Sequence, residues 1–310
     1  MPPIDPTDEH RHAPDPGVEL WNESYYLDWF TEDASLGGYI RIGFYPNLNR
    51  VWYWACLVGE GRPLVTVVEH DVAMPTSDRS LEVRHDGLWA DHAIETPNEH
   101  MSANLEAFGL SVDDPAEMYT PGGPRGERVP FGFELDWETD RAGYMWPPVT
   151  PRYEIPCSVH GFVQVGDERI EVDGWGQRDH SWGAARDWWE NRWVWSAGRL
   201  DDGTRFHSAG RFFEDNDWGV AYRLDPDTTE FTEAVEIAHG VTEGRERLPE
   251  STTLAHNGLE LTATPVAFSP VGLFHPTDGR LARFPRALTR YEDADGRSGA
   301  GWIEWNQPPQ

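Results

Sequence analysis

The chain has 310 residues, 38% of them hydrophobic and 13% aromatic, which is enough for two cores of ordinary size or one unusually large β domain. Its 54 acidic residues face 25 basic ones, all of them arginine, and give a formal net charge of −29. A surface this acidic repels nucleic-acid phosphates and anionic membrane faces, so we expect neither as a partner.

The first segment, MPPIDPTDEHRHAPDP, is polar and rich in proline. It lacks the basic region and the apolar stretch of a secretory signal. No part of the sequence reaches the ~18 apolar residues that a membrane span requires. We therefore expect a cytoplasmic protein without an integral membrane segment.

The next hundred or so residues show short apolar or alternating runs, broken by Gly, Pro and Asp. β-Branched and aromatic residues dominate these runs, which is typical of strands. The predicted strands here are 39–45, 51–58, 64–70 and 129–135. Helical periodicity is scarce, and the best candidate is a short piece at 115–119.

Residues 144–152, YMWPPVTPR, are predicted to form an extended connector, because residues that precede proline disfavour helix. We expect the domain boundary there, with an N-terminal half at 1–150 and a C-terminal half at 151–310. The strand pattern then resumes at 155–165, 193–200, 204–213, 219–224, 259–268 and 301–305. Hairpin turns are predicted at Asp202-Gly203, Asn257-Gly258 and Asp295-Gly296. The expected fold is all-β, with two tandem antiparallel halves, each a barrel or a sandwich.

The two cysteines, Cys56 and Cys157, lie among apolar residues and form no clustered spacing. This pattern predicts buried thiols rather than a disulfide framework or a structural zinc site.

The densest group of reactive side chains is GWGQRDHSWG, from Gly174 to Gly183, continued by RDWW. Its glycines indicate a backbone that is bent or closely approached. On a regular strand, Arg178, His180 and Trp182 share one face and Asp179 takes the other. A histidine beside an aspartate and an arginine can donate or accept a proton. The structural alternative is that arginine and aspartate only satisfy each other in a core.

Other candidates accompany this segment. Trp193 and Trp195 share a strand face and either line or fill an apolar cavity. Glu23 and Glu304 stand beside aromatic residues, and each would need an arginine or a ligand as its partner if buried. His207 and Asp187 complete the set. No tight two-histidine spacing exists, so no metal site is expected, and the common cofactor and nucleophile motifs are absent.

At GWGQRDHSWG, RDWW, NRWVWSAGRL and DGRSGAGWIEWNQP, the sequence resembles the lipocalin-related (calycin) superfamily that includes carotenoid 1,2-hydratase (hydroxyneurosporene synthase) and AttH-like proteins. It is most similar to uncharacterised bacterial members with the G-x-G-x-R-D-H-S-W-G string. WNESYY and GGYIRIGFYPN extend the resemblance to the front of the chain. The resemblance implies two lipocalin-like barrels in tandem, a lipophilic ligand between or within them, and acid–base chemistry on a carbon–carbon double bond.

By this resemblance, Asp179 and His180 are the expected proton donor or relay. The expected substrate-binding residues are Arg178, Trp182, Asp187, Trp193, Trp195, His207, Glu23 and Glu304. The leading hypothesis is a cofactor-independent hydratase or isomerase that acts on a hydrophobic terpenoid-, steroid- or carotenoid-like molecule. The alternatives are a non-catalytic carrier of a lipophilic small molecule and a carbohydrate-binding β protein.

Overall fold

The computed structural model describes residues 4–148, 150–183, 185–211, 218–234, 237–275 and 278–309. They form a nearly all-β structure, as expected. The strands of the first sheet are β1 (Glu23–Phe30), β2 (Leu36–Tyr45), β3 (Arg50–Gly59), β4 (Leu64–Ala73), β5 (Val83–His85), β6 (Leu88–Thr96), β7 (His100–Val112), β8 (Glu127–Thr139), β9 (Tyr144–Met145), β10 (Arg152–Val165) and β11 (Glu168–Ser181).

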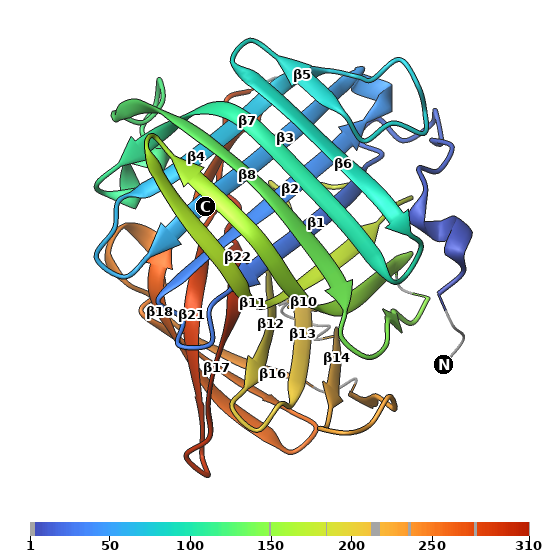
Figure 1. Cartoon of the computed structure of the whole chain (residues 1–310), viewed down its shortest axis with the longest axis vertical. Helices are drawn as coiled ribbons and strands as arrows, with labels where there is room; N and C mark the ends of the chain where they lie inside the picture. Colours follow the sequence, from blue (N-terminus) through green and yellow to red (C-terminus); the bar gives the residue numbers. More distant parts are fainter. Residues whose placement is uncertain are drawn as a thin grey trace.

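The first sheet curls on itself. Its main order is β4-β3-β2-β1-β11-β10-β8-β7-β6-β5, and β4 also pairs with β7, from Leu64 opposite Val112 to Thr66 opposite Leu110. This extra pairing closes the strands between β4 and β7 into a barrel-like ring, which Figure 1 shows at the top in blue to green. Closure removes the exposed edges that an open sheet would present.

The second sheet is open and has the order β15-β14-β13-β12-β22-β21-β18-β17-β16. Its strands are β12 (Trp193–Leu200), β13 (Arg205–Arg211), β14 (Trp218–Leu224), β15 (Thr232–Ala234), β16 (Ala238–Thr242), β17 (Ser251–His256), β18 (Leu259–Phe268), β21 (Arg286–Asp293) and β22 (Ser298–Asn306). A separate hairpin joins β19 (Val271–Phe274) and β20 (Leu281–Phe284). The end of the strand predicted at 204–213 lies outside the described residues.

The change of sheet does not coincide with the boundary expected at residue 150. Strands β10 and β11 follow that boundary in the chain, yet they complete the first sheet, with β11 paired to β1 and β10 to β8. The second sheet begins only at Trp193. The segment GWGQRDHSWG, expected in the C-terminal half, is therefore mostly part of the first sheet.

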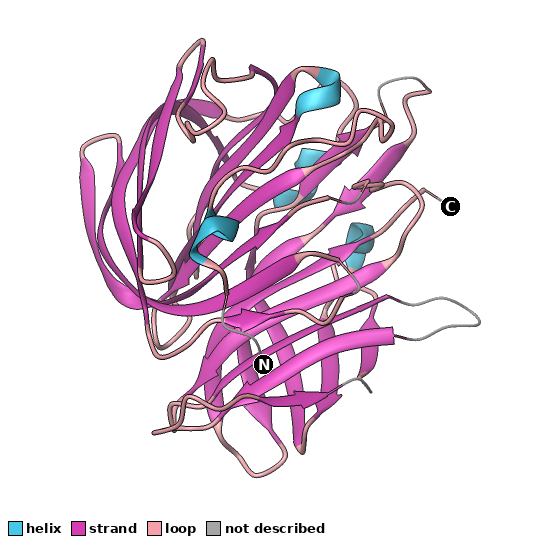
Figure 2. Ribbon diagram, turned by 90° about the vertical axis from the view of Figure 1, so that its right-hand side faces the viewer, coloured by secondary structure: helices cyan, strands magenta, loops and turns pink. Residues whose placement is uncertain are grey.

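Among the described residues, helical structure is limited to the short 3₁₀ pieces η1 (Pro6–Glu9), η2 (Pro46–Leu48), η3 (Pro115–Tyr119) and η4 (Arg245–Arg247), and η3 is the piece expected at 115–119. Figure 2 shows them in cyan against the magenta strands. None of the helices in the described part of the chain has the length and hydropathy that crossing a bilayer requires.

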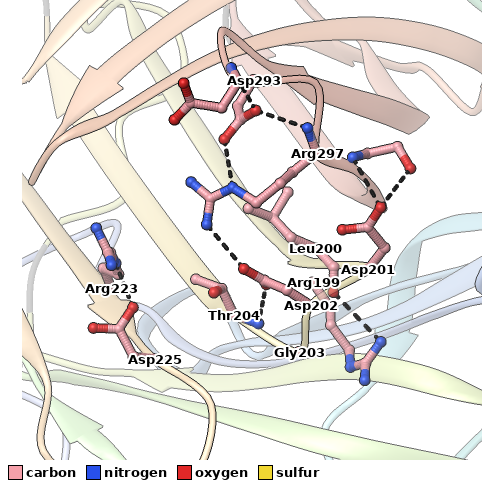
Figure 3. A network of polar contacts seen from close by, with 12 residues as sticks. Arg199, Leu200, Asp201, Asp202, Gly203, Thr204, Arg223, Asp225, Asp293 and Arg297 are labelled. Atoms are coloured by element: carbon pink, nitrogen blue, oxygen red, sulfur yellow. Dashed lines mark hydrogen bonds and ion pairs between the residues drawn. The ribbon is translucent and has the colours of Figure 1, made fainter.

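The predicted hairpin turns are confirmed. Asn257 and Gly258 link β17 to β18 with φ angles of 50° and 72°, as a tight two-residue turn demands. The other two turns lie next to each other, and an arginine joins them (Figure 3): Arg297 pairs with Asp202 at 2.9 Å and with Asp293 at 2.6 Å. These contacts fix the ends of β12, β13, β21 and β22.

The two sheets pack face to face over a core rich in aromatic side chains. Tyr26, Tyr39 and Trp54 from the first sheet share this core with Trp195 and Trp302 from the second. Trp302 Nε1 donates a hydrogen bond across the interface to the Trp29 carbonyl at 3.0 Å. A second core fills the barrel interior, and a third lies on the far face of the second sheet. Cys56 and Cys157 are buried free thiols, as predicted.

Glycine lets β1 and β11 lie close together. A Cβ atom at Gly176 would lie 2.0 Å from the Asp28 carbonyl oxygen, and one at Gly174 would lie 2.5 Å from that of Phe30. Backbone atoms cannot move aside as a flexible side chain can, so the close approach expected at these glycines is confirmed. Gly183, with φ of 84°, turns the chain out of β11.

Candidate functional site

Strand β11 sends its side chains to two different places. His180 lies opposite Tyr25 of β1, and Asp179 lies opposite Tyr26. Tyr25 belongs to the barrel core, whereas Tyr26 belongs to the core between the sheets. The predicted alternation is confirmed, and Asp179 and His180 therefore serve separate clusters.

Asp179 contributes to a small polar cavity between the two sheets. The cavity measures about 20 Å³, which is room for about one water molecule. Its wall contains four arginines and two carboxylates beside aromatic rings: Ser24, Tyr26, Arg41, Arg152, Asp179, Arg186, Trp188, Trp193, Phe284, Arg286 and Glu304. Both large sheets, the connection between them and the β19–β20 hairpin supply this wall.

Arg152 bridges two buried carboxylates. Its Nη2 lies 2.5 Å from Asp179 Oδ2, and its Nε donates to Glu154 Oε1 at 2.7 Å. Glu154 also accepts hydrogen bonds from the Gln177 amide at 3.0 Å and from Trp195 Nε1 at 3.2 Å. Glu154 thus accepts more hydrogen bonds from protein donors than Asp179 does.

The difference in donors helps to separate the pKa values of Asp179 and Glu154. Burial raises the pKa of Asp179 well above its ordinary value, against the pull of Arg152 and helped by the charges of Glu154 and Glu304. Burial would also raise the pKa of Glu154, but Arg152 and the Gln177 amide together lower it. Of the two carboxyls, Asp179 therefore keeps a proton to the higher pH.

Glu304 faces the same cavity from β22. It pairs with Arg286 Nη2 at 2.8 Å, which is the arginine of the two expected partners, an arginine or a ligand. Burial nevertheless raises the pKa of Glu304. The Arg286 guanidinium lies over the ring of Tyr39 at 3.7 Å and over that of Tyr26 at 4.5 Å. These cation–π contacts hold a buried positive charge at the cavity wall.

His207 and Asp28 lie behind the cavity. The His207 ring is 3.5 Å from Glu154, and burial lowers its pKa to about 4, so the imidazole is neutral. Asp28 accepts a hydrogen bond from the Gln177 backbone N–H at 2.8 Å, and burial raises its pKa to about 8. Sequence reasoning missed Asp28, because its strand carries no alternating pattern.

The two tryptophans of the predicted aromatic wall, Trp193 and Trp195, have different surroundings. Trp195 is fully buried and fills the core beside Tyr26, whereas Trp193 lines the polar cavity. Trp193 also borders a larger neighbouring cavity of about 300 Å³. The remaining lining residues of that cavity are Arg192, Val194, His239, Val241, Trp305, Asn306 and Gln307. Asp187 is placed elsewhere: it accepts the Trp189 backbone N–H at 3.0 Å in the turn before Trp193.

A second cluster forms on the barrel side of β11. Glu23 was expected to need an arginine or a ligand as its partner if buried, and its protein partners are instead two histidines: His12 Nδ1 at 2.7 Å and His180 Nε2 at 3.1 Å. Burial lowers the pKa of His180, partly offset by Glu23. Trp182 stacks on the His12 ring with centroids 4.1 Å apart. Arg178 donates to Glu9 of η1 at 2.8 Å.

The sequence therefore named members of both clusters without separating them into sites. Asp179, Trp193, Trp195, His207 and Glu304 gather between the sheets, and Arg178, His180, Trp182 and Glu23 gather on the barrel side. Arg152 and Glu154 were missed, although a signal existed. They stand two residues apart on the strand that pairs with β11, which places Glu154 opposite Asp179.

Comparison with known proteins gives a family and a shared fold. The DUF7064 profile, described as a domain of unknown function, matches residues 5–309. No curated protein matches the sequence. A protein from Nitrosomonas europaea assigned as AttH has a similar structure, with a TM-score of 0.67 and 13% identity over 98% of this chain and 99% of that one.

Two further solved structures share the fold. Kievitone hydratase from Nectria haematococca gives a TM-score of 0.64 at 11% identity, over 100% of this chain and 94% of that one. CghA in complex with Sch210972 gives 0.59 at 8% identity, over 94% and 89%. Identities this low establish a common architecture and leave the chemistry to be argued from the site.

Proposed function

The chain belongs to the DUF7064 family, and we propose that it is an acid–base enzyme of the hydratase or isomerase type, in which Asp179 donates a proton to a carbon–carbon double bond. The substrate class that we propose is a hydrophobic molecule of terpenoid, steroid or carotenoid kind. Kievitone hydratase, which shares the fold over nearly its whole length, is named as a hydratase. That likeness makes the reaction class worth testing here.

One observation carries the proposal: two carboxylates share Arg152, and their pKa values move in opposite directions. A proton donor must hold its proton at neutral pH and yet be able to release it. The raised pKa of Asp179 favours the first condition. The adjacent Arg152 guanidinium meets the second, because it stabilises the carboxylate once the proton has left.

In the proposed step, the Asp179 carboxyl protonates one carbon of the double bond, which leaves a carbocation on the other. The ring faces of Tyr26, Trp188 and Trp193 line the cavity and stabilise that cation. For hydration, a water molecule adds to the cation and returns its extra proton to the Asp179 carboxylate. For isomerisation, the carboxylate removes a proton from a neighbouring carbon instead.

The substrate body is proposed to occupy the cavity of about 300 Å³, which lies within the usual size range of small-molecule pockets. Trp193 lines both this cavity and the polar one, so the proposal requires the substrate to pass this residue for its double bond to reach Asp179. His180 takes no part in the proton transfer, because its side chain points to the opposite face of β11.

The test uses deuterium transfer to carbon, which can be detected whatever the product is. Wild-type protein is incubated in D₂O with kievitone, neurosporene and geranylgeraniol, and carbon-bound deuterium is measured by mass spectrometry. We expect incorporation or addition of water with at least one substrate, and a loss of about 100-fold or more in Asp179→Asn. The matched control is Asp173→Asn, an exposed aspartate on the same strand, which retains full activity.

The alternative function is a carrier of a lipophilic small molecule, and the ion pair between Arg152 and Asp179 is the observation that favours it. A carrier would bind the same ligand in wild type and Asp179→Asn and leave it chemically unchanged. Native mass spectrometry of the purified protein detects such a ligand. Equal binding without deuterium transfer, for the ligand so identified, would overturn the enzyme proposal.

A further inference from the structure

Three side chains with metal-binding atoms converge on one point from distant parts of the chain. His12 follows η1, Glu23 begins β1, and His180 lies near the end of β11. The ring nitrogens and a carboxylate oxygen of these residues all lie within 4.8 Å of one another. Glu23 and His180 are 1% and 0% exposed, and His12 is 24% exposed, so the point is open only on the His12 side.

Asp8 lies beside both imidazole rings. His180 Nδ1 lies 2.8 Å from the Asp8 backbone carbonyl, which can only accept a hydrogen bond, so Nδ1 carries the proton. His12 Nε2 lies 3.6 Å from an Asp8 carboxylate oxygen. In both rings the outer nitrogen thus faces an oxygen of the same residue. Oxygen acceptors at the outer nitrogen are the usual support of metal-bound histidines.

The inner nitrogens face Glu23. With Nδ1 turned to the Asp8 carbonyl, His180 directs Nε2 at Glu23 Oε1, 3.1 Å away. His12 Nδ1 approaches the same carboxylate oxygen at 2.7 Å. The Glu23 carboxylate is itself held in place by the His12 backbone N–H, which lies 2.8 Å and 3.0 Å from its two oxygens.

We propose that His12 Nδ1, Glu23 Oε1 and His180 Nε2 bind a divalent transition-metal ion of the zinc type. Metal–ligand bonds of about 2.0–2.2 Å in a tetrahedral site place ligand atoms about 3.3 Å apart. The observed separations of 2.7 Å and 3.1 Å from Glu23 reach this value with shifts of a few tenths of an ångström. Two histidines and one glutamate leave a fourth position for water, on the exposed His12 side.

The bound ion would fasten the N-terminal segment to the barrel. Asp8, Glu9 and His12 already contact β1 or β11 through His180, Arg178 and Glu23, and the ion adds a coordinate link between the same parts. It lies on the face of β11 opposite Asp179, so the ion takes no part in the proton transfer proposed above. The two proposals can therefore fail independently.

The test measures Co²⁺ binding to the full-length protein after removal of metals with a chelator. Titration is followed by the visible absorption bands of tetrahedral or five-coordinate Co²⁺ and by calorimetry, with excess Mg²⁺ present to occupy exposed carboxylates. We expect one ion per chain, displaced by Zn²⁺. His12→Ala is expected to bind at least about tenfold more weakly, and Glu23→Gln likewise. Circular dichroism verifies that both variants fold.

The matched control is His10→Ala, an exposed histidine two residues away, which binds Co²⁺ as the wild type does. Absence of the visible bands in the wild type would overturn the proposal, as would unchanged Co²⁺ affinity in His12→Ala. In either case, the three residues would form a hydrogen-bonded group only.

Discussion

Buried carboxyls around the inter-sheet cavity differ in the donors that surround them, and their pKa values are shifted in opposite directions. Glu154 has Arg152, a glutamine amide and an indole N–H close to it, and its pKa is lowered. Asp179 shares the same arginine but has fewer donors, and burial raises its pKa. Asp28 has one backbone N–H and lies behind them, with its pKa raised to about 8 by burial. Buried carboxyls with raised pKa values are the kind of group that acts as a general acid in enzymes.

Asp28 gives a prediction about stability and pH. Its folded-state pKa of about 8 exceeds the ordinary value, so between about pH 4 and pH 8 the folded chain keeps a proton that the unfolded chain releases. The contribution of Asp28 to stability therefore falls as pH rises through this window. Asp28→Asn cannot ionise and keeps the acceptor for Gln177. Relative to wild type, its free energy of unfolding should rise by about 1–4 kcal/mol from pH 5 to pH 8.

Urea denaturation at the two pH values measures this change. The matched control is Asp113→Asn, an exposed aspartate before η3. A difference between Asp28→Asn and wild type that stays constant over the window would mean that Asp28 is already ionised in the folded protein.

At the scale of elements, β1 and β11 form the shared wall of the two clusters, and η1 covers its barrel side. Every residue of β1 is buried, because one face meets the barrel core and the other meets the second sheet. The Glu9 side chain of η1 is fully buried and pairs with Arg178, itself 2% exposed. The N-terminal segment is therefore an integral part of the barrel core.

The Glu9–Arg178 pair yields the prediction for this scale. Glu9→Gln leaves a buried guanidinium without its counter-charge, which is expected to lower the free energy of unfolding by about 3–5 kcal/mol. Chemical denaturation measures the loss. Replacing both partners by apolar residues, Glu9→Leu with Arg178→Met, is expected to recover part of it, since no unpaired charge remains. A loss below about 1 kcal/mol in Glu9→Gln would show that water reaches Arg178.

The first sheet shows which strands could be predicted from the sequence. Strands β2, β3, β4 and β8 were recognised because apolar and aromatic runs stand between turn residues. β1 was not marked out as a strand, because burial on both faces removes the alternation that identifies a half-buried strand. His12, Glu23 and His180 are 11 and 157 positions apart, and only the register of β1 on β11 and the path of η1 bring them together. Local pattern does not encode such long-range pairing.

At the scale of the molecule, the polar cavity lies between two sheets, and charged side chains of the second sheet contact the first. Arg286 from the second sheet stacks on Tyr26 and Tyr39 of the first, and Arg205 from the second sheet donates to the Cys157 carbonyl of the first at 2.9 Å. Separating the sheets would expose a core of aromatic side chains and break these contacts. A boundary at residue 150, as expected from the sequence, would separate β10 and β11 from the other strands of the first sheet.

This arrangement predicts that the two sheets unfold together. Multidomain proteins commonly unfold in several steps, so a single transition would show that the two sheets unfold as one unit. We expect one endotherm in scanning calorimetry, with calorimetric and van't Hoff enthalpies in a ratio near one. Trp302→Phe removes the indole hydrogen bond to the Trp29 carbonyl and should lower the midpoint temperature by a few degrees without dividing the peak. Two resolved endotherms in the wild type would mean that each sheet carries its own stability, and the cavity around Asp179 would then open whenever the weaker sheet unfolds.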